Sequence, residues 1–217
     1  MRYDLLLFDL DGTLVDTAEG ILKSVIHTLN AYGIAVEDTN TLLRFIGPPI
    51  PYSFRTFYGF SEEEAQRAVA IYRQRYSAKG QFECHVFPGV PEMLAKLRER
   101  GHRLCVATSK PEPYARAMLD RLGIAELFDE IVGSDFAEKL KTKSDVIEEV
   151  FRRTGVTDRS GVLMIGDRKY DILGAKESGI DCLGVYMGYA EPGELENAGP
   201  TYLARGVEGM ENFLLQL

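Results

Sequence analysis

The hydrophobic pattern predicts two kinds of structure along the chain. Short apolar runs at residues 5–8, 103–107, 131–133, 162–165 and 182–185 have the length of buried strands, the last run being the last strand expected. From residue 87 onward, helices are predicted between these runs, at 91–100, before Gly123, at 144–153, at 171–178 and from 207 to the end. Strands that alternate with helices are typical of an α/β fold with a parallel sheet buried on both faces.

A helical region interrupts this alternation after the first strand. Asp16 and Glu19 resemble a capping box, and the apolar helix face that follows them ends near Gly33. A short helix is expected at 38–45, a break at Gly47-Pro48-Pro49-Ile50-Pro51, and a third helix from Ser61 to about residue 80. We therefore predict a doubly wound parallel sheet from residues 1–15 and 84–217, with a helical domain at 16–83.

Composition and charge narrow the range of partners. The 217 residues are 45% hydrophobic and 27% charged, which is ordinary for a globular protein. A net charge of −8 argues against a general nucleic-acid or anionic-membrane binder. Three cysteines without paired spacing predict neither a disulfide framework nor a zinc site. Aspartates interrupt any signal-peptide core near the start, and no apolar run has the length of a membrane span, so we expect a cytoplasmic protein.

The first strand ends in Asp9-x-Asp11-Gly12. Residues two apart in an extended chain point to the same side, so both carboxylates are expected to face one spot where Gly12 lets the backbone turn. Ligands of open α/β sheets bind at this edge. Two carboxylates so close repel each other unless a metal neutralises them or one holds a proton. The alternative is an ordinary polar strand end with a capping aspartate.

Two further strand ends carry polar groups that are expected to converge on the same edge. Thr108 and Ser109 follow the second strand, and Asp167 with Asp171 follows the run at 162–165. Several oxygen ligands with open positions suit Mg²⁺, and a hydroxyl with an exposed amide suits phosphoryl oxygens. Lys143, ahead of the helix at 144–153, is the candidate to balance their charge, although the nearby Lys139 and Lys141 leave a solvated basic run as the alternative.

Together these segments resemble the haloacid dehalogenase superfamily. Asp9-x-Asp11-Gly12-Thr13-Leu14, Thr108, a lysine before a helix, and Gly166-Asp167-x-x-x-Asp171 look like its four ordered motifs over residues 5–186. The run from Gly166 to Lys176 is similar to that of the phosphoglycolate phosphatase-like branch. The inserted helices resemble the helical cap of that branch, and Arg44-Phe45-Ile46-Gly47-Pro48-Pro49 resembles its substrate loop.

The resemblance implies a role for each matching residue. Asp9 would attack phosphorus and form an aspartyl-phosphate, and Asp11 would protonate the leaving oxygen and later activate water. Mg²⁺ would be held by Asp9, the backbone carbonyl of Asp11, Asp167 and, directly or through a second layer, Asp171. The transferring phosphoryl group would be bound by Gly12, Thr108, Ser109 and Lys143, with Lys143 favoured over Lys139 and Lys141 by its position just before the helix. Ser109 departs from the asparagine that is frequent in the branch.

We therefore expect a Mg²⁺-dependent phosphatase of small phosphate monoesters, similar to phosphoglycolate phosphatases and present as a monomer or homodimer. A 5′-nucleotidase or a sugar phosphatase would use the same core, because selectivity lies in the cap. Asp11 disfavours a dehalogenase and Thr13 a sugar-phosphate mutase, while the intact motifs argue against a non-catalytic phosphate-binding regulator. Arg44, Gly47 and Pro48 are the candidates for substrate specificity, although Arg44 could equally be a solvated helix-end arginine.

Overall fold

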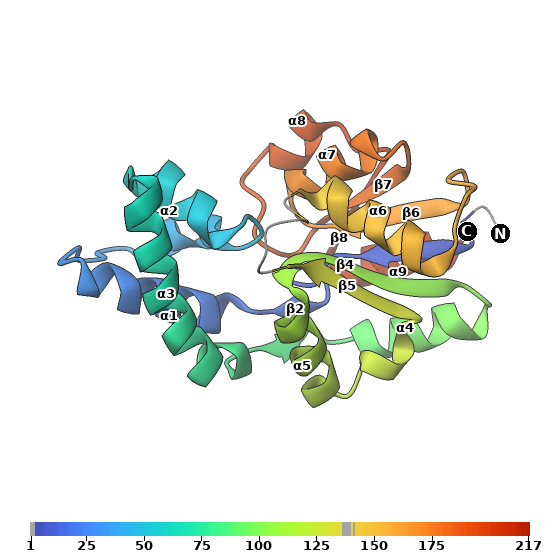
Figure 1. Cartoon of the computed structure of the whole chain (residues 1–217). Helices are drawn as coiled ribbons and strands as arrows, with labels where there is room; N and C mark the ends of the chain where they lie inside the picture. The colour runs from blue at the N-terminus through green and yellow to red at the C-terminus, as the bar shows by residue number, and fades with distance from the viewer. Residues whose placement is uncertain (1–2, 136–139, 141) are drawn as a thin grey trace.

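The computed structural model describes residues 3–135, 140 and 142–217. In that part of the chain, six strands form a parallel sheet in the order β5-β4-β1-β6-β7-β8 (Figure 1). Their bounds are β1 Leu5–Phe8, β4 Arg103–Pro111, β5 Glu130–Ser134, β6 Val162–Gly166, β7 Asp181–Tyr186 and β8 Tyr202–Arg205. The predicted α/β fold with a doubly wound parallel sheet is confirmed.

Helices cover both faces of the sheet, as Figure 1 shows. One face packs against α4 (Val90–Glu99), α5 (Glu112–Leu122) and α9 (Gly206–Leu214), with the short 3-10 helix η3 (Ala125–Leu127) beside them. The other face packs against α6 (Lys143–Thr154), α7 (Lys169–Glu177) and α8 (Glu194–Ala198). In β1, Leu6 and Phe8 enter the first core while Leu5 and Leu7 enter the second. Alternating side chains of one strand thus fill two cores, which explains why the run is apolar throughout.

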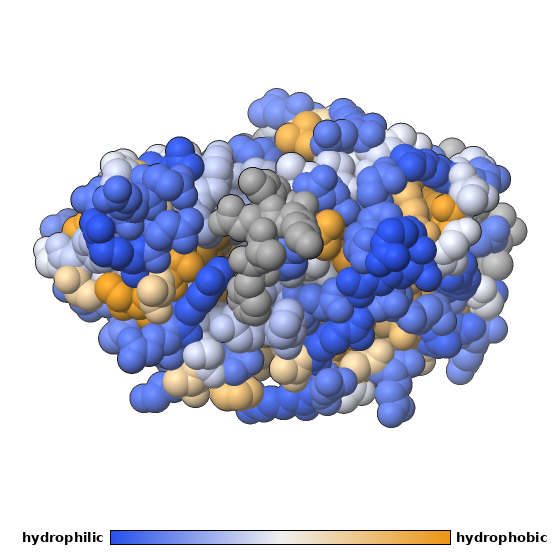
Figure 2. Space-filling view, in the orientation of Figure 1, coloured by the Kyte–Doolittle hydropathy of each residue, from blue (hydrophilic) through white to orange (hydrophobic). Residues whose placement is uncertain are grey.

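The inserted residues form a helical lobe with its own core beside the sheet. Its elements are α1 Ala18–Ala31, η1 Thr39–Phe45, α2 Ile50–Tyr58, α3 Glu62–Ala78 and η2 Gly80–Phe82. The chain enters through β2 (Val15–Asp16) and returns through β3 (His85–Val86), which pair antiparallel. Figure 2 shows apolar residues gathered on the lobe where it turns toward the sheet. The lobe joins the rest of the chain through these paired strands, and Tyr114 and Tyr189 from outside the lobe pack against its core.

Some local expectations are confirmed and others are wrong. The Ser61 hydroxyl and the Glu64 carboxylate form the reciprocal bonds of a capping box at the start of α3. The capping box expected at Asp16 and Glu19 is absent, because Thr17 takes the N-cap position and Asp16 Oδ1 accepts a hydrogen bond from the backbone of Ala18 at 3.1 Å. The helix expected at 38–45 is present as the 3-10 helix η1.

Several elements lie where the pattern predicted none, among them α2, α8 and β8. Helix α2 begins at Ile50, inside the expected break at residues 47–51, because Pro51 falls in its first turn, where no intrahelical N–H bond is lost. Strand β8 follows β7, so the run at 182–185 is not the last strand of the sheet. Only alternate residues of β8 are half-buried, because it is an edge strand. No helix in the described ranges is both long and apolar enough to span a membrane.

Candidate active site

The three central strands bring the predicted polar residues to one edge. In the sheet register Phe8 of β1 lies beside Val106 of β4 and Ile165 of β6. Asp9 follows β1 directly, Asp167 follows β6 directly, and Thr108 lies two residues beyond the β4 partner. All three side chains are buried. The predicted convergence of these strand ends is therefore present, because parallel strands all end at the same edge.

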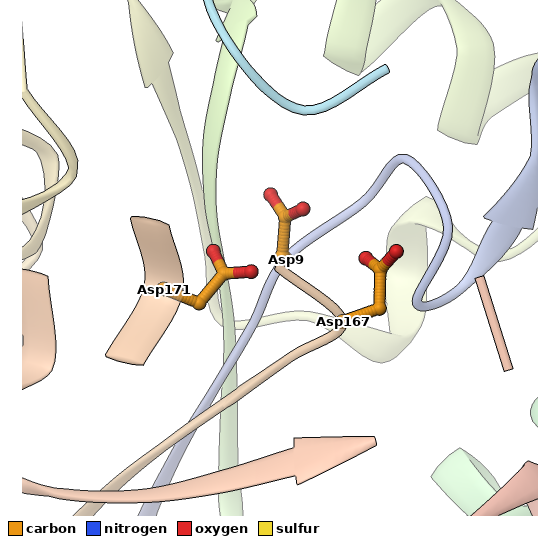
Figure 3. A group of neighbouring side chains, drawn as sticks. All are labelled: Asp9, Asp167 and Asp171. Atoms are coloured by element: carbon orange, nitrogen blue, oxygen red, sulfur yellow. The ribbon is translucent and has the colours of Figure 1, made fainter. Parts of the chain in front are cut away.

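Three carboxylates form a compact cluster at this edge. One oxygen from each of Asp9, Asp167 and Asp171 lies within 4.8 Å of the others. Figure 3 shows Asp9 between the other two, with all three carboxylates directed to the same side of the strand ends. Asp171 joins the group from the first turn of α7, so two neighbouring strands and one helix supply the three ligand-type oxygens.

Lys143 is the cation of the cluster. It is the first residue of α6, and its ammonium lies 2.7 Å from Asp9 Oδ1 and 2.7 Å from Asp171 Oδ1. It also donates to the carbonyl of Ala107 at 2.9 Å, one residue before Thr108. Only 3% of the side chain is exposed, which excludes a solvated position. The competing Lys139 and Lys141 lie outside the described residues.

Asp167 is held rigidly by its surroundings. Its carboxylate accepts hydrogen bonds from the Thr13 hydroxyl at 2.9 Å and from the backbone N–H of Tyr189 at 2.9 Å. Two glycines allow this close packing: a Cβ added to Gly12 would lie 2.4 Å from Asp167 Oδ2, and one added to Gly188 would lie 2.1 Å from it. Gly12 also has a φ of +86°, which L side chains rarely adopt.

Burial and mutual repulsion perturb the acid–base properties of the cluster. Burial is the main reason that the pKa of Asp9 is raised to about 6; Asp171 and Asp11 add to this rise, while Lys143 opposes it. The pKa of Asp167 is raised well above its ordinary value by burial and by the charges of Asp9 and Asp171. Burial alone would lower the pKa of Lys143, but the Asp171 and Asp9 carboxylates outweigh it and raise the pKa.

The donor set fits a hard divalent cation. When ionised, the three clustered carboxylates bring three negative charges against the one positive charge of Lys143, so a dication would neutralise the excess. Carboxylate oxygens are the ligands that Mg²⁺ prefers, and no soft sulfur or imidazole ligand belongs to this cluster of described residues. Burial is the first cause of the raised pKa values of Asp9 and Asp167, and the neighbouring carboxylates add to it; a bound cation would oppose both effects.

Asp11 lies beside the cluster and has a different partner. The ammonium of Lys110 is 3.0 Å from Asp11 Oδ1 and donates to the hydroxyl of Tyr76 at 2.9 Å. Tyr76 belongs to α3 of the helical lobe, whereas Lys110 lies at the end of β4. Within the described part of the chain, Lys143 is thus ion-paired with Asp9 and Asp171, and Lys110 with Asp11.

A cavity of about 580 Å³ opens between the helical lobe and the strand ends. Asp11, Ser109, Gly47 and Pro48 line it together with aromatic side chains from both parts, among them Tyr76 of α3 and Tyr114 of α5. Arg44 is not among the described residues that line the cavity. Its guanidinium carbon lies 4.4 Å from the centre of the Phe57 ring, within the lobe.

Three residues that contact or position the site were not predicted from the sequence. Lys110 pairs with Asp11, and Arg168 donates to the carbonyl of Ile46 in the helical lobe while it pairs with Glu194 at 2.8 Å. Tyr189 holds Asp167 through its backbone and Asp16 through its hydroxyl at 2.6 Å. The available signal was position: Lys110 and Arg168 each stand next to a motif, directly after Ser109 and Asp167.

Known proteins are similar to this chain over most of its length. A 5′-nucleotidase of Pseudomonas aeruginosa is 40% identical over 99% of this chain and 96% of its own. Tyrosine-protein kinase PtkA of Mycobacterium tuberculosis is 37% identical over 91% of this chain and 67% of its own. The crystal structure of a predicted phosphatase from Clostridium acetobutylicum matches with a TM-score of 0.96 and 42% identity, with both chains fully covered.

The family model described as haloacid dehalogenase-like hydrolase matches residues 6–185. That range contains the clustered carboxylates, Lys143 and the helical lobe, and it agrees with the range of the resemblance noted from the motifs. The chain therefore belongs to the haloacid dehalogenase-like hydrolases and is an enzyme of their phosphatase group.

Proposed function

We propose that this protein is a Mg²⁺-dependent phosphatase that hydrolyses phosphate monoesters through an aspartyl-phosphate on Asp9. The observation that carries this proposal is the position of Lys143, buried between Asp9 and Asp171 at 2.7 Å from each. A cation held there keeps Asp9 available as a charged nucleophile despite its burial. It also lies where the negative charge of a transferring phosphoryl group would develop.

In the first half-reaction, an Asp9 oxygen attacks phosphorus while the ester P–O bond breaks, and the leaving alcohol takes the proton of Asp11. Lys143 remains charged and compensates the phosphoryl oxygens. Thr108, Ser109 and the Gly12 turn would orient the phosphoryl group through hydroxyl and backbone N–H donors. The products of this step are the free alcohol and the aspartyl-phosphate on Asp9.

In the second half-reaction, the Asp11 carboxylate takes a proton from water, whose oxygen attacks phosphorus. The bond between phosphorus and the Asp9 oxygen breaks, phosphate leaves, and Asp11 is protonated again for the next cycle. One residue thus serves as acid and then as base. The contact with Lys110 at 3.0 Å supports the assignment through geometry, because it holds the Asp11 side chain in one orientation for both steps.

Asp9, Asp167, Asp171 and the backbone carbonyl of Asp11 would hold Mg²⁺. The ion would supply positive charge against the phosphoryl oxygens and reduce repulsion between the incoming phosphate and the clustered carboxylates. The rigid hold on Asp167, by Thr13 and the Tyr189 backbone, supports its assignment as a ligand.

A nucleoside 5′-monophosphate is the favoured substrate class. The 580 Å³ cavity has the size of an ordinary small-molecule site and is lined by aromatic rings, so it exceeds what a substrate as small as phosphoglycolate would fill. The 40% identity to a 5′-nucleotidase supports the same choice. Phosphoglycolate, indicated by the motif resemblance, is the second candidate. In either case residues 16–83 act as the cap domain over the core of residues 1–15 and 84–217.

Phosphate release by purified protein tests the proposal. A panel of nucleoside monophosphates, phosphoglycolate, a sugar phosphate and p-nitrophenyl phosphate is assayed with Mg²⁺ and with EDTA. We expect Mg²⁺-dependent turnover, and we expect Asp9→Asn to lower it by at least about 10³-fold with the fold intact. Because one relative is named a kinase, inorganic phosphate is measured directly. Activity of Asp9→Asn within about tenfold of the parent would contradict the nucleophile assignment.

A further inference from the structure

Lys110 occupies a buried position between the two parts of the molecule. Only 5% of its side chain is exposed, and its ammonium lies 3.0 Å from Asp11 Oδ1 and 2.9 Å from the Tyr76 hydroxyl. Burial by itself would lower the pKa of Lys110, but Asp11 and Tyr76 raise it, so the side chain is charged. A buried ammonium with these two partners is oriented by both of them.

The backbone around Lys110 is built to direct its side chain inward. The register between β4 and β5 shifts between Thr108 and Pro111, and the Lys110 N–H donates to the Thr108 hydroxyl at 3.2 Å. Gly133 of β5 makes room for this irregularity, because a Cβ there would lie 2.4 Å from the Lys110 carbonyl oxygen. The position of the ammonium is therefore set by the end of the strand rather than by a flexible loop.

Tyr76 is equally fixed, but from the helical lobe. Its ring stacks on Tyr72 of the same helix, with centroids 5.3 Å apart, and meets Tyr114 of α5 edge-on at 5.6 Å. Burial raises the pKa of Tyr76, so its hydroxyl is neutral and can accept the Lys110 N–H. The hydroxyl reaches Lys110 only when α3 lies against the sheet edge, as it does here.

We propose that Lys110 is a positioning residue that holds the Asp11 carboxylate in its catalytic orientation, and that Tyr76 makes this hold depend on the docking of the helical lobe. The inference rests on the proposed phosphatase function. Lys110 does not touch the phosphoryl group; it acts through Asp11. With the lobe displaced, Lys110 would lose the Tyr76 hydroxyl and Asp11 would be less well oriented, so proton transfer would be favoured only in the docked arrangement.

The test compares substrates that differ in their need for a general acid. A nucleoside monophosphate has a poor leaving group and needs the proton of Asp11, whereas p-nitrophenyl phosphate has a good one and needs it little. We expect Lys110→Met to lower kcat/KM by about 10²-fold for the first substrate and by less than about tenfold for the second. The parameter kcat/KM is used because it reports the steps up to the formation of the aspartyl-phosphate.

Four further variants distinguish a positioning role of Lys110 from a structural one. Lys110→Met in an Asp11→Asn background should cost little beyond Asp11→Asn alone, because both changes remove the same function. Tyr76→Phe should show the same leaving-group dependence with a smaller loss, and Lys110→Arg should recover part of the activity. Lys96→Met, at an exposed lysine paired with Glu211, is the matched control and should leave both substrates unchanged.

Several results of these assays would contradict the proposal. Equal losses on both substrates for Lys110→Met would mean a structural or phosphate-binding role and would overturn the proposal, as would no loss on either. Full additivity with Asp11→Asn would also overturn it, and an effect of Lys110→Met without any effect of Tyr76→Phe would overturn the coupling to the lobe. A parent protein that releases no phosphate refutes the proposed function and the inference together. An active parent with an inactive Asp9→Asn variant keeps the function whatever Lys110 does.

Discussion

Replacing Lys143 by methionine removes the positive charge that the carboxylate cluster contains. Methionine has a similar length and fills the same space, so the change is mainly one of charge. Asp9 and Asp171 each lose a partner at 2.7 Å, and both are buried. Removing one partner of a buried ion pair costs about 3–5 kcal/mol because the remaining charge stays desolvated. We expect this loss of unfolding free energy at a pH near 8 in EDTA, which is above the pKa of about 6 that Asp9 has in the parent protein.

Urea unfolding followed by circular dichroism measures this loss. With a dependence of about 2–3 kcal/mol per molar urea, the midpoint should fall by about 1–2.5 M. Adding Asp171→Asn to Lys143→Met should restore part of the lost unfolding free energy, since it removes one of the buried carboxylates that no longer has a partner. Mg²⁺ should stabilise Lys143→Met more than it stabilises the parent, because a dication replaces the missing charge.

The matched control is Lys96→Met, whose exposed pair with Glu211 is worth at most about 1 kcal/mol. A Lys143→Met midpoint within about 0.3 M of the control variant, in EDTA, would refute the reasoning that the ammonium compensates the cluster. A double variant with Asp171→Asn that is less stable than Lys143→Met alone would show that the methionine disturbs packing rather than charge.

The remaining predictions concern pH, a glycine and a cap residue. In EDTA, the unfolding free energy measured by urea titration should decrease as pH rises from about 4 to about 6. The reason is that the pKa of Asp9 is raised in the folded state from 3.8 to about 6, so the folded state binds the proton more tightly than the unfolded state. Saturating Mg²⁺ should remove this decrease. Gly188→Ala should displace Asp167 and weaken Mg²⁺ binding in calorimetry at least about tenfold, whereas Gly209→Ala, in a helix where the added Cβ would make only ordinary van der Waals contacts, should leave it unchanged. Arg44→Ala should leave KM for both a nucleoside monophosphate and p-nitrophenyl phosphate within about threefold, because the guanidinium packs on Phe57; a tenfold rise for the nucleotide alone would instead support a substrate contact.

Much of the site could be predicted because its chemistry is local to strand ends. The apolar run at 5–8 predicts a strand from its composition alone, and the aspartate that follows such a strand must lie at the ligand-binding edge of a parallel sheet. The same reasoning places Thr108 and Asp167, since each follows its own apolar run. The Ser61 capping box is also local, because both of its bonds lie within one helical turn.

Contacts between distant segments were decided only by the tertiary structure. Lys110 looks like any surface lysine before a proline, and its ammonium becomes buried where the Tyr76 side chain of α3 and Asp11 meet it at the end of β4. Arg44 could have faced the cavity or the Phe57 ring, and the packing of the lobe selected the ring. Residues 202–205 form a strand because β7 offers an unpaired edge, not because their own pattern requires it. Local propensity sets which elements form, but the meeting of side chains from different elements depends on the summed packing of the whole chain.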